Sequence, residues 1–208
     1  MTGIITALVI QKKNKERVNV FLDDAYAFAV TLDVALTLKK GQHLQPEEVE
    51  RFQDEDQVNK AYQHALHYLS YRPRTRQEVT QNLQKKEYSD EAIDLVIERL
   101  ESLSYIDDVA FAQSWIENRS IHNPKGRTAL AYELRQKGLT QAEIDQSLED
   151  LDETTLAWQA VQKKMRQWRT LDEATLRQKV KGYLARRGFT YSTISTVFEQ
   201  VLETLEDG

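Results

Sequence analysis

Histidines and paired acids are the residues of this sequence that could support metal or acid–base chemistry. His64 and His67 stand three residues apart, a spacing at which two imidazoles on one helix face could hold a metal ion. The chain has no cysteine and no third ligand nearby, so a solvated pair beside Tyr68 is the better interpretation. We therefore predict no metal site and no cofactor.

The acidic runs also have simpler interpretations than catalysis. Asp107 and Asp108 could form a nuclease metal pair, but they precede an apolar helical segment, where N-cap and salt-bridge roles are typical. Residues 54–56, Asp-Glu-Asp, fit the solvated face of a linker. The sequence holds no nucleophile motif and no phosphate-binding glycine loop. We expect that the protein is not an enzyme.

Composition limits the fold class and the compartment. Of 208 residues, 40% are apolar and 29% charged, whereas seven glycines and three prolines are too few for a turn-rich all-β sandwich. The lack of cysteine fits a reducing cytoplasm and excludes a disulfide scaffold. No run approaches the roughly 18 apolar residues of a membrane span, and the first residues lack the order of a secretory signal. We expect a soluble, mainly α, cytoplasmic protein without membrane contacts.

Charge is distributed unevenly along the chain. The formal net charge of −5 argues mildly against a general nucleic-acid binder. Residues 160–208 nevertheless carry nine basic and six acidic groups. Within residues 163–187, nine cations face only Asp172 and Glu173, a local excess of seven positive charges. The final third is therefore the candidate surface for an anionic partner.

The first thirty residues have the alternation of strands. Apolar residues alternate over 5–9 and again over 18–22, on either side of a polar run, which predicts a hairpin. A third strand over 26–30 would follow a turn at Asp23 and Asp24 and complete a small sheet. From Pro46 onward the pattern becomes helical, because proline and the acids after it are typical of a helix first turn.

An internal repeat organises the helical part. Segments that begin at Arg76, Arg127 and Arg177 align at offsets of 51 and 50 residues and match at their apolar positions. Each segment predicts a helix, a basic turn with an apolar plug and a second helix, and an earlier helix completes the unit. Three capping boxes support this division, at Thr75, Thr140 and Thr170, each followed three residues later by glutamate.

These patterns give four expected regions. They are a β-rich extension with an acidic linker over 1–58 and three-helix repeats over 59–108, 109–159 and 160–208. A fifty-residue helical unit is marginal alone, so we expect the repeats to pack together as an elongated, curved stack.

Basic residues recur at matching repeat positions, at the start and at the end of each middle helix. A cation in a last turn complements the helix dipole by about 0.3–1 kcal/mol and needs no external partner. Arg76, by contrast, directly follows the Thr75 cap, where a bound anion would meet both backbone N–H groups and a guanidinium. Aromatic residues do not alternate with these cations, so recognition of bases is not expected.

Three motifs of the sequence read YLSYRPRTRQEV, SYIDDVAFAQSWIENR and NPKGRTALAYELRQKGLTQAEI. With them the sequence resembles the RecX family of RecA regulators, over residues 60–208 and most strongly from Ala65 to Leu148. The start, with ERVNVFLDDAYAFAV and LKKGQHL, is similar to the N-terminal extension of RecX proteins from low-GC Gram-positive bacteria. One departure is Glu87, which stands where a glycine often ends the first middle helix.

The resemblance implies a non-enzymatic modulator that binds the RecA–DNA filament, with its single-stranded DNA, and restrains ATP hydrolysis and strand exchange in DNA repair, recombination and the SOS response. It carries no catalytic residues over. The matching aromatic and acidic motif positions, such as Tyr105, Phe111 and Trp115, are expected to be architectural. The expected filament- and DNA-binding residues are all basic: Arg72, Arg74, Arg76, Lys125, Arg127, Arg135, Lys137, Arg177, Lys179, Lys181, Arg186 and Arg187.

Two other functions fit the residues. The repeats could be independent helix-turn-helix units that bind naked DNA tightly, with a steep salt dependence. Alternatively, the chain could be an adapter that binds protein alone, for which affinity would survive salt.

Overall fold

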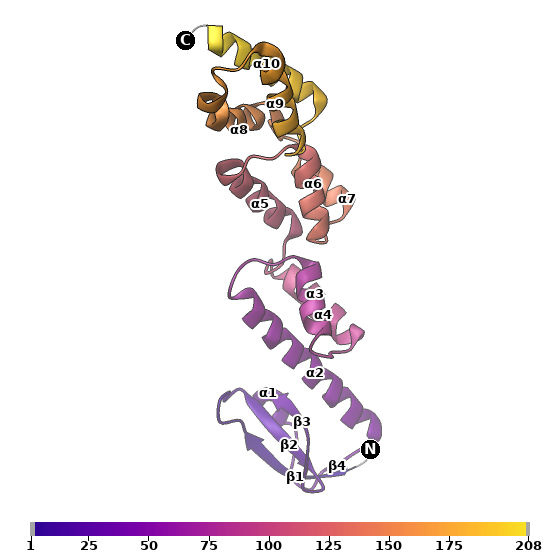
Figure 1. The fold of residues 1–208 in the computed structure, drawn as a ribbon. Coiled ribbons are helices and arrows are strands. Elements are labelled where there is room, and N and C mark those ends of the chain that lie inside the picture. The colour runs from indigo at the N-terminus through magenta and orange to yellow at the C-terminus, as the bar shows by residue number, and fades with distance from the viewer. Residues whose placement is uncertain (1–2, 207–208) are drawn as a thin grey trace. The chain divides into compact units, whose positions relative to one another are not determined.

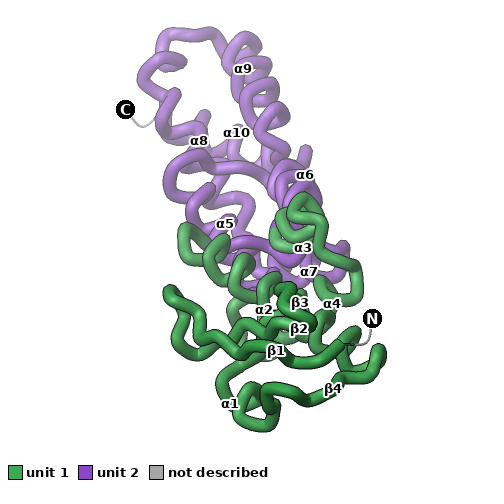
Figure 2. The backbone as a smooth tube through the Cα atoms, turned by 90° about the horizontal axis from the view of Figure 1, so that it is seen from below, with its two compact units in different colours: residues 1–72, 79–105 green, residues 73–78, 106–208 purple. Residues whose placement is uncertain are grey.

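The computed structural model describes residues 3–206 and has four strands and ten helices within them (Figure 1). The chain divides into two compact units, drawn in different colours in Figure 2. Unit 1 comprises residues 1–72 and 79–105, and unit 2 comprises residues 73–78 and 106–208. Within residues 3–206, no helix combines the length and the apolar character needed to cross a membrane.

The expected N-terminal sheet is present. Its antiparallel strands lie in the order β3-β2-β1-β4. They span β1 (Gly3–Ile10), β2 (Arg17–Leu22), β3 (Ala25–Thr31) and β4 (His43–Leu44). Asp23 and Asp24 join β2 to β3 with φ values of 46° and 65°, as a two-residue type I′ hairpin turn requires. The short helix α1 (Leu32–Ala35) and β4 were not expected.

Helix α2 (Pro46–Leu69) begins where the sequence predicted and runs without interruption into repeat 1. Gln45 and Glu48 form its capping box. The sheet packs on it, and the rings of Phe28 and Phe52 stack with centroids 5.1 Å apart. The predicted boundary at residue 58 therefore lies inside a helix.

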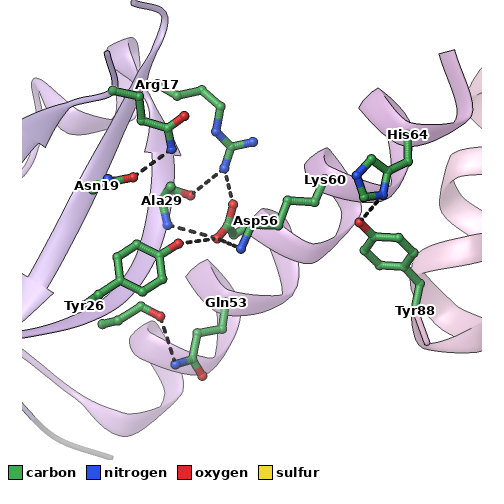
Figure 3. Close-up of polar contacts among 11 residues, drawn as sticks. Arg17, Asn19, Tyr26, Ala29, Gln53, Asp56, Lys60, His64 and Tyr88 are labelled. Carbon is green, nitrogen blue, oxygen red and sulfur yellow. Dashed lines mark hydrogen bonds and ion pairs between the residues drawn. The ribbon is translucent and has the colours of Figure 1, made fainter. Parts of the chain in front are cut away.

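The prediction of a solvated acidic linker is wrong at Asp56. This residue is helical and only 3% exposed. Its carboxylate accepts the N–H of Ala29 at 3.0 Å and the Tyr26 hydroxyl at 3.3 Å, and pairs with Arg17 and Lys60 (Figure 3). The acid is buried because strand partners from the sheet satisfy its charge.

The three predicted repeats are three-helix units. Repeat 1 consists of α2, α3 (Arg76–Gln84) and α4 (Asp90–Ser102). Repeat 2 consists of α5 (Asp108–His122), α6 (Arg127–Gln136) and α7 (Gln141–Ser147). Repeat 3 consists of α8 (Glu153–Trp168), α9 (Glu173–Ala185) and α10 (Tyr191–Glu206). The predicted boundary at 159 lies within α8, and the curved stack stays a prediction.

The predicted apolar stripes form the cores of the repeats. Leu83, Leu134 and Leu184, which occupy one repeat position, are all fully buried. In repeat 2, Leu134 packs in one core with Leu130 and Ile144, and Leu184 belongs to the larger core of repeat 3. Buried core residues therefore recur at the spacing of about fifty residues that the sequence repeat has.

Most predicted caps are confirmed, but one is wrong. The N–H of Ala110 donates to Asp107 at 2.8 Å, and Thr140 with Glu143 forms a complete capping box. Helix α9 is instead capped by Asp172, not by Thr170. It begins four residues before Arg177, whereas α3 and α6 begin at the corresponding arginines. Arg177 thus lies in the interior of a helix and pairs with Glu173 at 3.4 Å.

Glu87 has a backbone conformation that glycine adopts more easily. It adopts a φ of 61° at the turn after α3, where repeats 2 and 3 have Gly138 and Gly188 at 90° and 77°. A side chain in this left-handed region costs about 1 kcal/mol relative to glycine. We expect Glu87→Gly to raise the free energy of unfolding of repeat 1 by about 0.5–1 kcal/mol. Hydrogen exchange of the Leu83 amide is the measurement, and faster exchange in the variant would contradict it.

Candidate nucleic-acid interface

A carboxylate from repeat 2 lies at the start of α3. The backbone N–H of Arg76 donates to the Asp108 carboxylate at 2.9 Å, where the sequence suggested an external ligand. Beside it, the Thr75 hydroxyl donates to the carbonyl of Lys137 at 2.7 Å. All four residues belong to unit 2. The first acid of helix α5 therefore takes the place of the expected anion at this backbone group.

The same arrangement joins repeat 2 to repeat 3. The backbone N–H of Arg127 donates to Glu153 Oε1 at 2.8 Å, and the N–H of Gly126 donates to the Arg187 carbonyl at 2.9 Å. Glu153 also accepts the hydroxyls of Thr190 and Thr193 at 2.8 and 2.7 Å. In both junctions, the first residue of the next repeat caps the preceding middle helix.

Several of the recurring cations bind within the chain. Lys137 Nζ pairs with Glu78 at 2.9 Å, and its side chain is 26% exposed. The Arg187 guanidinium donates to Asn123 Oδ1 and, at 3.0 Å, to the Pro124 carbonyl. These two cations end the middle helices of repeats 2 and 3, so their repeat spacing reflects the junctions between repeats.

Lys125 belongs to a polar cluster inside repeat 2. Glu133 accepts Trp115 Nε1 at 2.8 Å and Arg119 Nε at 2.9 Å, and it pairs with Lys125. The Arg119 guanidinium also lies 4.6 Å from the centroid of the Trp115 ring. Burial raises the pKa of Glu133, but the hydrogen bonds from Lys125, Arg119 and Trp115 outweigh it, so the pKa lies below its ordinary value.

This lowered pKa predicts a pH dependence of stability. Because the folded chain binds the proton of Glu133 less tightly than the unfolded chain, the cluster contributes its full stability above the ordinary glutamate pKa of the unfolded chain, about 4.5. That contribution is lost as the pH falls through the folded pKa. We expect Glu133→Gln to destabilise unit 2 at pH 7, with a difference from the parent that shrinks below about pH 4. Urea titrations followed by tryptophan fluorescence measure it, and a difference independent of pH would contradict it.

Repeat 3 presents cations without ion pairs. Lys179, Lys181 and Arg186 are exposed on α9 and at its end, and among residues 3–206 none of them pairs with an acid. Lys181 Nζ lies 5.7 Å from the ring centroid of Tyr191, which is 74% exposed. Arg177 is more constrained, because its guanidinium lies 4.4 Å from the Phe198 ring centroid. These α9 residues are the part of the predicted site that is open to a partner.

The other predicted arginines lie in the loop before α3, at the start of α3 and at the two ends of α6. Arg72 and Arg76 are exposed and Arg74 is half-buried, and each has an interaction within the chain. Arg135 is exposed and donates to the Gln141 side chain at 2.7 Å. The side chain of Arg127 is half-buried beside the junction. These residues contribute charge at the surface but are less free to reorient toward a ligand.

His64 and His67, the pair considered as metal ligands, each contact a tyrosine. His64 Nδ1 lies 2.7 Å from the Tyr88 hydroxyl, and His67 Nε2 lies 3.0 Å from the Tyr71 hydroxyl. In the described part of the chain, no group of three or more histidine, cysteine, aspartate or glutamate side chains could hold a metal ion.

The chain has a small antiparallel sheet followed by tandem three-helix repeats, and the open cations of α9 lie in the last repeat. These features define a class of repeat proteins that offer a binding surface to other macromolecules. Comparison with known families matches the "Regulatory protein RecX N-terminal domain" over residues 3–45. The first, second and third three-helix domains of RecX match residues 61–100, 107–148 and 152–198. The chain belongs to the RecX family of regulatory proteins.

Individual relatives agree with this assignment. The regulatory protein RecX of Bacillus subtilis (strain 168) is 38% identical over 202 residues, covering 95% of this chain and 76% of the relative. That of Bacillus pumilus is 37% identical, covering 98% and 79%. A crystal structure of a regulatory protein RecX, 30% identical, superimposes with a TM-score of 0.77 and covers 95% of this chain and 99% of that chain. The RecX structure from Lactobacillus salivarius gives 0.66 at 26% identity, covering 71% and 97%.

Proposed function

We propose that this protein is a negative regulator of the RecA recombinase, that it binds the RecA filament on single-stranded DNA, and that it restrains ATP hydrolysis and strand exchange. Membership of the RecX family supports a regulatory role. The observation that carries the finer proposal is that some of the predicted cations are bound within the chain and others are open. Lys125, Lys137 and Arg187 bind within the chain, whereas Lys179, Lys181 and Arg186 are exposed without acidic partners.

In this proposal the open cations of repeat 3 contact DNA phosphates and acidic filament surface together. Cations without acidic partners in the chain lose no ion pair when they bind an anionic ligand. The net charge of −5 disfavours binding to naked DNA, so affinity depends on the filament supplying protein contacts as well. The protein carries out no catalysis and acts in the cytoplasm, in DNA repair, recombination and the SOS response.

A DNA-binding protein built of independent helix-turn-helix units fits the structure less well. Gly126 and Thr128 donate backbone hydrogen bonds to the turn after α9, at 2.9 and 3.2 Å. These bonds join repeats 2 and 3 within unit 2, which disfavours separate docking of each repeat in a groove of DNA.

Co-sedimentation distinguishes the candidate functions. The protein is mixed with preassembled RecA filaments on single-stranded DNA, with the same DNA alone, and with RecA alone, all at one salt concentration. Selective recovery with the filament is the expected result. Equal recovery with naked DNA would favour the DNA-binding function, and equal recovery with RecA alone would favour the protein adapter.

A further inference from the structure

Unit 1 carries an apolar groove that is separate from the basic repeat. It has a volume of about 630 Å³ and lies between β3, α1, α2 and α4. Its apolar lining includes Val30 from β3, Val34 from α1, Val58 from α2 and Leu95 from α4. All of these residues belong to unit 1. The groove therefore lies between the N-terminal sheet and repeat 1, within unit 1.

Leu95 is the unusual residue in this groove. It is 54% exposed on α4, between Ile93 and Ile97, which face the core. At the corresponding positions of repeats 2 and 3 the chain has Gln146 and Thr196. An exposed leucine is therefore specific to the repeat that adjoins the sheet. A large apolar side chain placed in a groove, where the other repeats have polar ones, indicates a surface that a partner covers.

The rim of the groove is acidic. Glu47, Glu50, Asp54 and Glu55 of α2 line it, and among the described lining residues Arg51 is the single cation. Arg51 makes its contacts within α2, since its Nε lies 4.0 Å from Glu55 and its guanidinium lies 4.9 Å from the Phe52 ring centroid. The rim therefore repels nucleic acid and attracts a cationic partner.

The wall formed by β3 is held in place before any partner binds. Asp56 accepts the backbone N–H of Ala29, and Gln53 Nε2 lies 3.5 Å from the Ala27 carbonyl (Figure 3). Arg17 donates to the Ala29 carbonyl at 3.2 Å and pairs with the same carboxylate. Because the free edge of β3 is fixed to α2, a ligand loses little free energy in ordering the groove.

We propose that this groove is a docking site for a cationic, amphipathic protein segment. Apolar side chains of that segment rest on Leu95 and Val58, and its lysines or arginines face the carboxylates of Glu50 and Asp54. The complementary pattern is a helix with leucine at i, i+3, i+4 and i+7 and basic residues beside that stripe. The proposed partner contacts residues of unit 1, whereas the open cations of α9 belong to unit 2.

The test uses the full chain and a fluorescein-labelled helical peptide of leucine and lysine with that spacing, followed by fluorescence anisotropy. We expect Leu95→Gln, which installs the residue of repeat 2, to weaken binding about tenfold, equivalent to about 1.4 kcal/mol. The double variant Glu50→Gln/Asp54→Asn should weaken binding to a similar degree and flatten its salt dependence. All three side chains are exposed, so the variants should fold, which circular dichroism verifies.

The matched control is Glu149→Gln/Glu199→Gln, which removes two exposed carboxylates from unit 2 and should leave the peptide affinity unchanged. Equal weakening by both double variants, or unchanged binding by Leu95→Gln, would overturn the proposal, because attraction would then be general electrostatics. Sedimentation of the protein alone gives a further outcome. A dimer that Leu95→Gln dissociates would assign the groove to a second copy of the chain and would also overturn it.

Discussion

Reversal of Lys179, Lys181 and Arg186 to glutamate is expected to weaken binding to RecA filaments by roughly 100-fold or more and to remove inhibition. These side chains are exposed and unpaired with acids, so the change alters the surface charge of repeat 3 by six units without breaking an intrachain ion pair. If each cation contacts a phosphate, the slope of log affinity against log salt should also fall by about 2. Arg177 and Arg187 are left unchanged because one packs on Phe198 and the other binds Asn123.

The control for this variant changes the same charge elsewhere. Lys12, Lys39 and Lys40 are exposed in the N-terminal region, and their reversal to glutamate also alters the charge by six units. We expect this control to retain most of its filament affinity at physiological salt. Equal losses in the two triple variants would show that net charge, and not the surface of repeat 3, determines binding.

Substitution of Gly126 by alanine is expected to lower the free energy of unfolding of unit 2 by about 3 kcal/mol. A Cβ at this position would lie 2.3 Å from the Gly188 carbonyl oxygen and 2.4 Å from backbone atoms of Phe189. Backbone atoms cannot move aside as a flexible side chain can. The loop before α6 must therefore retreat, with loss of the bond from Gly126 N–H to the Arg187 carbonyl.

The measurement is urea unfolding followed by tryptophan fluorescence. All three tryptophans, Trp115, Trp158 and Trp168, belong to unit 2, so their emission reports on this unit alone. The matched control is Gly182→Ala in α9, where the added Cβ meets only the Arg186 side chain at 3.3 Å. Because glycine is unfavourable in a helix interior, this control should be neutral or stabilising by up to about 1 kcal/mol. Similar midpoints for the two alanine variants would contradict the close contact of repeats 2 and 3.

Periodicity in the sequence predicted the repeats because their cores are regular. Leu83, Leu134 and Leu184 are buried at one repeat position, and buried residues alternate with a period of two in β2. Elements without a period were missed, such as the two-residue strand β4. The acidic run was misread for a different reason. Asp56 is buried by partners 27 to 39 residues away in the chain, which no local pattern indicates.

The candidate site was predictable as a set of charges but not as a surface. The cation excess of residues 163–187 can be counted in the sequence. Which cations are available depends on distant acids and carbonyls, such as Glu78, 59 residues from Lys137, and Asn123, 64 residues from Arg187. That Asp108 and Glu153 cap the middle helix of the preceding repeat was not predicted either. A comparison of the first helices of repeats 2 and 3 would have revealed these acids, since each begins with an acid.

The most direct test of the central claim is the rate of ATP hydrolysis by preassembled RecA filaments on single-stranded DNA as this protein is added. We expect turnover to fall with increasing protein, to saturate, and to remain unchanged when the Lys179, Lys181 and Arg186 reversal variant is added instead. Naked-DNA binding measured at the same salt should be much weaker than filament binding. Turnover unaffected by the parent protein, under conditions where it co-sediments with the filament, would contradict its role as a negative regulator of RecA.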